Sequence, residues 1–190
     1  MKRLLLTIVA ILGLAATASA QVRLPEMPTR ASGHTDYRVK ETGYWIGGLL
    51  DGYFASNGRS MAGAVQFNIV QGYRFSEFLK VGIGVAPKYY FLGNTDFCGK
   101  NGSPISVPIY ADVRGNINPQ TDAEFAFCWS ADAGYAINEG VYLSPFIGIR
   151  IGDIRHNFTA GITYAFQGHY VDEYNNRPIH LVGLRVGYEF

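Results

Sequence analysis

The side chains that most often carry enzyme chemistry are scattered along this chain rather than grouped. A serine nucleophile needs an adjacent base to activate it, and no histidine stands near Ser130 and Asp132, the most plausible such pair. The sequence contains no phosphate-binding loop, zinc signature or nucleophile elbow, and its histidines lack the spacing of a metal site. It therefore predicts no catalytic residues, no metal ligands and no cofactor. The histidines are His34, His156, His169 and His180.

The two cysteines, Cys98 and Cys128, form the next candidate group. Disulfides form in proteins that are exported to an oxidising compartment, so a Cys98–Cys128 bridge is a possible prediction. Their spacing matches no known disulfide framework. The sequence leaves the bonded and the free state open.

Charged residues form the third group, because they alternate with large apolar residues. In the stretch 182–190 every second residue is large and apolar, and Arg185 and Glu189 lie between them. Successive side chains of a strand point to opposite faces, so such stretches predict strands with one apolar and one polar face. The charged residues of the polar faces are Asp51, Arg74, Lys80, Lys88, Asp112, Arg114, Glu124, Asp132, Arg150, Arg185 and Glu189.

Eight stretches with this alternation are expected to be strands, and they imply a closed barrel. Glycine (23 residues) and Tyr plus Phe (13 and 12) are abundant, while charged residues make up only 16%, a composition that favours β-structure. An even number of strands, each long enough to cross a bilayer, predicts an all-β, eight-stranded antiparallel up-and-down transmembrane barrel over 43–190. The expected strands are 43–54, 61–75, 80–92, 104–115, 122–137, 141–151, 157–167 and 179–190.

The interior of an eight-stranded barrel is only wide enough for side chains to fill it. Buried charges must be paired, and the polar faces carry acids and bases in nearly equal number. The charged residues therefore predict a salt-bridge network that plugs the lumen. A narrow ion path lined by the same residues is the alternative.

Aromatic residues on the apolar faces support a membrane barrel, and a few positions fit it less well. If both ends of the barrel chain face the periplasm, the outward aromatics fall near the two ends of the strands, as in the girdles of membrane barrels. Proline cannot donate to a β-ladder, so Pro87, Pro108 and Pro145 should mark bulges, strand ends or other boundaries. Gln71 is expected to face lipid.

Residues 1–20 have the features of a cleaved signal peptide: basic Lys2 and Arg3, an apolar run over 4–14 and a small-residue site at 18–20. Residues 21–42 are polar and predict a flexible periplasmic lead-in. The whole chain has a formal net charge of +1, which gives no case for nucleic-acid binding. No apolar run after the leader is long enough for a membrane-spanning helix.

The stretches S-V-P-I-Y-A-D-V-R-G (106–115) and L-R-V-G-Y-E-F (184–190) resemble the small eight-stranded outer-membrane β-barrel proteins of Gram-negative bacteria, of the OmpA/OmpX type. More narrowly, the chain resembles the outer membrane protein beta-barrel domain or porin-like family. The resemblance implies a monomer in the cell outer membrane, in contact with outer-membrane lipid and assembled by the barrel insertion machinery. Val186, Tyr188 and Phe190 match the family's C-terminal assembly signal, whereas Arg185 stands where a glycine is often found.

The fold hosts many functions, so several functions stay open. The leading expectation is a non-enzymatic barrel with a structural, surface-interaction or limited small-solute-passage role. Since some eight-stranded barrels modify lipid A, a lipid A-modifying enzyme that uses His169 near an outer strand end is the first alternative. The second is a secreted lipocalin-like barrel that binds a small apolar ligand, although its apolar face would have to be inside.

Overall fold

The computed structural model describes residues 42–91, 97, 103–119, 125–137, 139–153, 155–168 and 178–190. The predicted signal peptide and most of the predicted lead-in lie outside these ranges. So do Cys98, Glu124, His34 and His169. Within the described ranges no helix is long and apolar enough to cross a membrane.

The described chain is built from antiparallel strands, and their bounds lie within a few residues of the expected ones. Each strand alternates buried and exposed residues, as the two-residue period of a pleated strand requires. The strands are β1 (Gly43–Ser56), β2 (Met61–Ser76), β3 (Leu79–Val85), β4 (Lys88–Phe91), β5 (Ile105–Asn116), β6 (Phe125–Ile137), β7 (Gly140–Gly152), β8 (Asn157–Gln167) and β9 (Ile179–Glu189).

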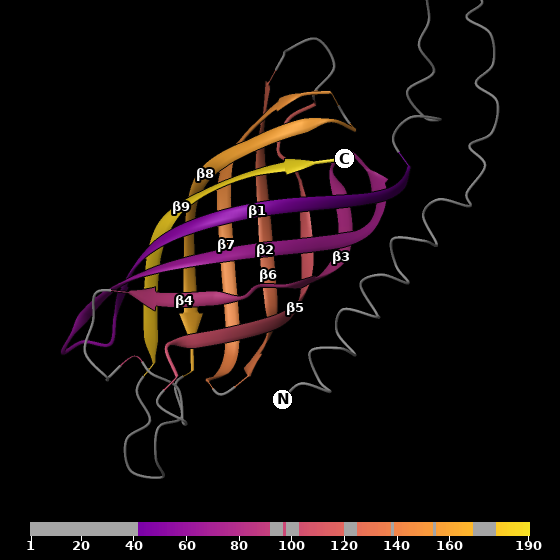
Figure 1. Cartoon of the computed structure of the whole chain (residues 1–190). Coiled ribbons are helices and arrows are strands. Elements are labelled where there is room, and N and C mark those ends of the chain that lie inside the picture. The colour runs from indigo at the N-terminus through magenta and orange to yellow at the C-terminus, as the bar shows by residue number, and fades with distance from the viewer. Residues whose placement is uncertain are drawn as a thin grey trace, which may run out of the picture. The chain divides into compact units, whose positions relative to one another are not determined.

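The sheet closes on itself because β1 pairs with both β2 and β9 (Figure 1). The other strands pair with their neighbours along the chain, and β3 and β4 both lie between β2 and β5. The nine strand segments thus occupy eight positions around the barrel. This confirms the all-β, eight-stranded antiparallel barrel predicted from the sequence. Closure leaves no unpaired edge in the sheet formed by the described strands.

The stretch expected as one strand over 80–92 is interrupted at Ala86 and Pro87, which corrects that expectation. β3 ends at Val85 and β4 begins at Lys88. The backbone groups at the break are still bonded, because the Ala86 N–H donates to the Pro108 carbonyl (2.9 Å) and the Pro87 carbonyl accepts from Phe67 N–H (3.0 Å). Pro87 therefore marks a strand end, one of the outcomes that its missing donor predicts.

The other two prolines lie inside strands. Pro108 stays in β5 opposite Ala136 of β6. Pro145 lies in β7, and the β7–β8 ladder is interrupted beside it, between the Leu143–Phe166 and Phe146–Thr163 pairs. Pro108 therefore marks none of the irregularities expected of it, whereas Pro145 marks a local break in the β7–β8 ladder.

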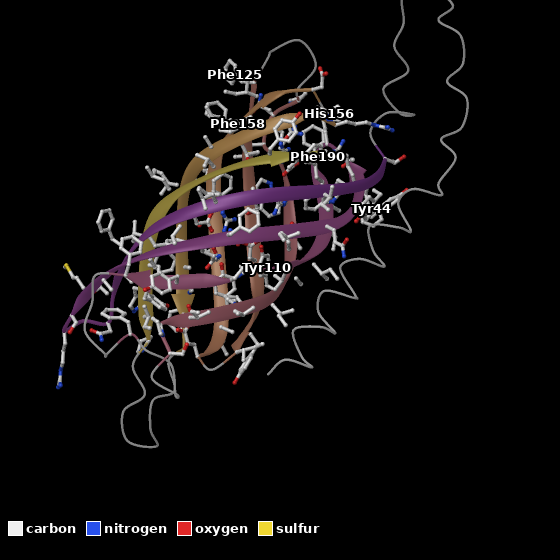
Figure 2. The ribbon with its side chains drawn as sticks, in the orientation of Figure 1. Tyr44, Tyr110, Phe125, His156, Phe158 and Phe190 are labelled. Atoms are coloured by element: carbon white, nitrogen blue, oxygen red, sulfur yellow. The ribbon has the colours of Figure 1, made fainter. Side chains whose placement is uncertain are left out.

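The two faces of the barrel differ as the alternation predicts, with large apolar side chains outside and polar ones in the lumen. We call the end where β1 begins and β9 ends the terminal end, and the opposite end the loop end. Figure 2 shows Tyr44, Phe125, Phe158 and Phe190 together near the terminal end. The polar Gln71 on this outer face accepts a hydrogen bond from the Tyr44 hydroxyl (2.6 Å), which satisfies its carbonyl oxygen.

Glycines on the lumen face make room for large aromatic side chains on the neighbouring strands. Tyr110 lies directly opposite Gly84 across β5 and β3, and a Cβ at Gly84 would lie 2.5 Å from the Tyr110 Cζ. Tyr53 covers Gly183 of β9 in the same way. Aromatic rings over cross-strand glycines are a recurrent means of fixing register in curved sheets. This pairing explains part of the high glycine and tyrosine content.

Candidate functional site: the barrel lumen

The charged residues picked out by alternation converge inside the barrel. Ten of the eleven are buried, with at most 3% of their surface exposed. The eleventh, Glu124, lies outside the described residues. The ten are Asp51, Arg74, Lys80, Lys88, Asp112, Arg114, Asp132, Arg150, Arg185 and Glu189.

Glu189 of β9 is the centre of a cluster toward the terminal end. Its carboxylate accepts from Lys80 Nζ (2.6 Å), Arg114 Nη1 (2.8 Å) and Arg150 Nη2 (3.3 Å). Arg114 also donates from Nε and Nη2 to the Asp112 carboxylate, with the shorter contacts at 2.7 Å. Four strands are therefore joined through one carboxylate.

Arg185 is the centre of a second cluster. Its guanidinium binds both oxygens of Asp51 on β1 (2.8 and 3.0 Å) and reaches Asp132 on β6 (3.1 Å). It also contacts the hydroxyl groups of Ser130 and Ser144, each at 3.4 Å. These bonds connect β1, β6, β7 and β9 across the lumen. Bidentate arginine–carboxylate pairs are among the stronger ion pairs in proteins.

Uncharged polar side chains extend the second cluster. Gln66 Nε2 donates to the Tyr142 hydroxyl (2.9 Å) and to Asn68 Oδ1 (2.8 Å). Asn68 Nδ2 in turn donates to Asp51 Oδ2 (2.9 Å). A connected set of hydrogen bonds therefore runs from Tyr142 through Asp51 to Arg185.

Lys88 lies apart from both clusters, toward the loop end. Its Nζ donates to Gln167 Oε1, and lies 5.4 and 5.6 Å from the ring centroids of Tyr90 and Tyr142. Glu139, in the turn between β6 and β7, is buried nearby. Burial raises the pKa of the Glu139 carboxyl, and Lys88 partly offsets that rise.

Arg74, like Lys88, lies outside both clusters. It is buried, and it forms no ion pair with any other described residue. Its Nε has no hydrogen-bond partner in the ranges that the structure describes. The sequence placed Arg74 on the correct face but gave no indication of this isolation.

Trp45, Tyr142 and Glu139 are among the lumen residues that were not singled out from the sequence. Trp45 is fully buried, with Arg114 4.6 Å and Lys80 5.7 Å from its ring, a geometry that supports cation–π attraction. Its even spacing from Asp51 along β1 could have placed it inside. Tyr142 and Arg150 of β7 are likewise an even number of positions apart, so alternation could have placed Tyr142 inside as well. Glu139 could not be found by alternation, because it lies in a turn.

The cysteines and the C-terminal apolar residues are the remaining candidates from the sequence. Cys128 is buried in the lumen and is bonded to no other described residue; Cys98 lies outside the described residues, so the disulfide stays a prediction. Val186, Tyr188 and Phe190 all point outward from β9 and its end, and the Phe190 N–H donates to the Ile46 carbonyl (2.8 Å). Their role as an assembly signal also stays a prediction.

The described histidines lie at opposite ends of the barrel. His156 packs edge-on against Phe190 at the terminal end. His180 Nδ1 lies 2.6 Å from the Tyr164 hydroxyl on the outer face, near the loop end. The structure therefore does not bring these two histidines together.

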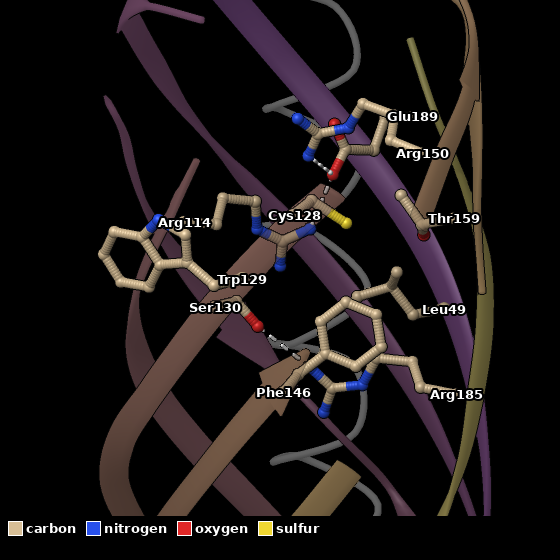
Figure 3. Close-up of a pocket in the computed structure, with 10 residues that line it drawn as sticks. All are labelled: Leu49, Arg114, Cys128, Trp129, Ser130, Phe146, Arg150, Thr159, Arg185 and Glu189. Carbon is tan, nitrogen blue, oxygen red and sulfur yellow. Dashed lines mark hydrogen bonds and ion pairs between the residues drawn. The ribbon is translucent and has the colours of Figure 1, made fainter. Parts of the chain in front are cut away.

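A cavity of about 10 Å³ lies between the two charged clusters (Figure 3). A water molecule needs roughly 10–15 Å³ of such space, so the cavity holds about one water-sized particle. Its walls include Arg114, Arg150, Arg185 and Glu189. Side chains thus leave little open space in this part of the lumen.

The closed eight-stranded barrel and its apolar outer face are those of one class of proteins. The chain has the fold of the small eight-stranded outer-membrane barrels. Among solved structures the chain is similar to Neisserial surface protein A, with a TM-score of 0.61, 13% identity, and coverage of 78% of this chain and 97% of that one. This neighbour confirms the expected resemblance at the level of the fold.

Two Pseudomonas aeruginosa barrels also match. One is the N-terminal β-barrel domain of OprF, with a TM-score of 0.43, 11% identity, and coverage of 76% of this chain and 97% of that one. The other is the outer membrane protein OprG, with a TM-score of 0.35, 11% identity, and coverage of 78% and 96%. No family model matches the sequence, and no curated protein matches it.

Proposed function

We propose that this chain is an integral outer-membrane β-barrel of a Gram-negative envelope, with a structural or surface-interaction role and at most limited passage of small solutes. The observation that carries the proposal is that polar side chains lie inside and apolar side chains lie outside, the reverse of a water-soluble protein. Ion-paired residues fill the lumen, while large apolar residues such as Phe54 (84% exposed) and Leu184 (67% exposed) cover the outside. A soluble protein rarely exposes large contiguous apolar patches, whereas lipid solvates them.

The proposed orientation places the terminal end in the periplasm and the loop end outside the cell. In this arrangement the outer-membrane lipid contacts the apolar face, and the two longer connections face the exterior, as is usual for such barrels. A cleaved signal peptide would deliver the chain, and the insertion machinery would read the outward-facing Val186, Tyr188 and Phe190. We infer a monomer without nucleic-acid partners.

A non-enzymatic role fits the described chemistry better than lipid A modification. That alternative needs an activated serine beside a histidine; among the described residues His180 contacts the Tyr164 hydroxyl and His156 the Phe190 ring, and His169 lies outside the described residues. A lipocalin-like role fits less well, because its ligand would need an apolar interior. Mass analysis of lipid A from an expressing strain tests the enzyme: a new acylation or deacylation product would contradict the non-enzymatic role.

Gel mobility of the detergent-solubilised protein, boiled against unboiled, tests the membrane barrel. A closed barrel resists cold detergent, so the unboiled protein should run at a different apparent mass, and it should sediment with outer membranes. Protein that stays in the soluble fraction and shows no mobility shift would contradict the proposal and favour a secreted barrel.

We further propose that the two charged clusters plug the lumen. The clusters centred on Glu189 and Arg185 bridge strands across the interior, and the cavity between them holds about one water-sized particle. Protein reconstituted in a planar bilayer should therefore show little steady conductance. Large and stable single-channel steps would instead support the ion path.

A further inference from the structure

Arg150 and Thr159, two neighbouring residues in the wall of the lumen cavity, each carry a buried polar atom that has no partner among the described residues. Arg150 of β7 and Thr159 of β8 are register partners, and each is only 2% exposed. Opposed residues of an antiparallel pair have Cβ atoms about 4.5–5.5 Å apart. Within the described part of the chain, neither the Arg150 Nε nor the Thr159 Oγ1 has a hydrogen-bond partner. Both residues line the cavity, as Figure 3 shows.

Both terminal nitrogens of the Arg150 guanidinium have a partner. Its Nη1 donates to Asn116 Oδ1 and its Nη2 to Glu189 Oε1, so these bonds hold the head group while the Nε–H edge is left without an acceptor. An unpaired buried donor is costly. A hydrogen-bond acceptor bound inside the cavity would give the Arg150 Nε–H group a partner.

The side chains of the cavity wall favour a negatively charged ligand that accepts hydrogen bonds. Three guanidinium groups, those of Arg114, Arg150 and Arg185, line the cavity, and an arginine side chain offers donors only. The carboxylate in the wall, Glu189, already accepts from Lys80, Arg114 and Arg150. A water molecule could give its protons only to the Ser130 and Thr159 hydroxyl oxygens or to Glu189, whereas an anion needs no acceptor and is attracted by the three guanidinium groups.

We propose that this cavity is a binding site for one small monovalent inorganic anion of the halide class. Arg150 Nε and Thr159 Oγ1 donate to the ion, and Arg114 and Arg185 supply the surrounding positive charge. The volume of about 10 Å³ admits a single ion and excludes polyatomic anions such as phosphate. The bound ion links β7 and β8 to the cluster around Glu189.

Crystals of the full barrel grown in sodium bromide test the site directly. An anomalous-scattering peak within hydrogen-bond distance of Arg150 Nε and Thr159 Oγ1 is the expected result. Water-like density without anomalous signal, or an empty cavity, would overturn the proposal.

Thermal unfolding of the refolded protein gives a second, solution test. A ligand that binds only the folded state raises the melting temperature, so chloride should raise it by a few degrees relative to gluconate at equal ionic strength. Thr159→Val removes the donor without changing the shape and should abolish this chloride effect. Thr163→Val is the matched control, because Thr163 is also a buried threonine of β8 but does not line the cavity; it should keep the effect. Equal melting temperatures of the wild type in the two salts would contradict the anion site.

Discussion

Glu189 is the single side chain on which the terminal-end cluster depends most. Glu189→Gln leaves the charges of Lys80, Arg114 and Arg150 without their shared carboxylate. Breaking a buried ion pair on one side costs about 3–5 kcal/mol, so we expect a loss of this order in urea unfolding of the refolded barrel. Asp153→Asn is the control, because Asp153 is an exposed residue of a turn; it should change stability by less than about 0.5 kcal/mol. Equal effects of both substitutions would show that the cluster contributes little.

The facing direction of these charges could be read from the sequence, whereas their pairing could not. Alternation alone placed Arg185 and Glu189 in the lumen, because a strand has a period of two residues. That Arg185 of β9 meets Asp132 of β6 depends on the shear and the width of the closed barrel, and neither leaves a local signal. Trp45 is an even number of positions from Asp51 on the same strand, so alternation places both on the lumen face. Its aromatic side chain gave no reason to expect it among charged groups.

At the scale of elements, the β6–β7 turn carries a titratable group whose burial affects stability. Burial raises the pKa of the Glu139 carboxyl, despite opposing effects from Lys88 and a hydrogen bond to Ser106. The folded state then binds a proton more tightly than the unfolded state does, so the contribution of Glu139 to stability falls as the pH rises from about 4.5 toward the folded-state pKa. Glu139→Gln should lose this part of the pH dependence.

Urea midpoints of both proteins measured from pH 4 to pH 8 (roughly the range in which carboxyl groups of raised pKa titrate) test this expectation. The variant should gain stability relative to the wild type as the pH rises, and the difference should level off above the folded-state pKa. A difference that shrinks with rising pH would mean that Glu139 is stabilised in its charged form.

The packing of aromatic rings over glycines gives a prediction for the strand register. A Cβ at Gly84 would lie 2.5 Å from the Tyr110 ring, so Gly84→Ala must displace this ring. Overpacking typically costs about 1–3 kcal/mol, and we expect a loss of that order in the free energy of unfolding. Gly52→Ala is the control, because a Cβ there meets nothing within 4 Å. If the two variants unfold alike, Tyr110 does not pack against Gly84 as described.

Strand boundaries were predictable because turns interrupt alternation visibly, as at Asn57 and Gly58. The break between β3 and β4 was only partly predictable. Pro87 indicated an irregularity, but Pro108 and Pro145 gave the same signal and lie within continuous strands. Whether a proline ends a strand depends on which neighbouring carbonyl and N–H groups still find hydrogen-bond partners. These partners are known only once all strands are paired.

At the scale of the whole molecule, a depth-dependent substitution series distinguishes a membrane barrel from a soluble one. Ile147 and Ile151 lie on the same outward face of β7, the first near the middle of the strand and the second near its terminal end. In a bilayer, an arginine on the lipid face costs about 2–4 kcal/mol at the midplane and about 0–1 kcal/mol near the interface. Ile147→Arg should therefore destabilise the barrel in lipid vesicles far more than Ile151→Arg does.

The same pair of variants provides its own control, because residue types and strand are matched and only the depth differs. Unfolding free energies measured in vesicles should separate by roughly 2–3 kcal/mol if β7 spans the bilayer. In a water-soluble barrel an arginine at either outward position would be solvated, and both variants would be as stable as the wild type or more so. Equal stability of the two variants in vesicles would therefore place the apolar face outside the membrane, and the lumen network would then belong to a secreted protein.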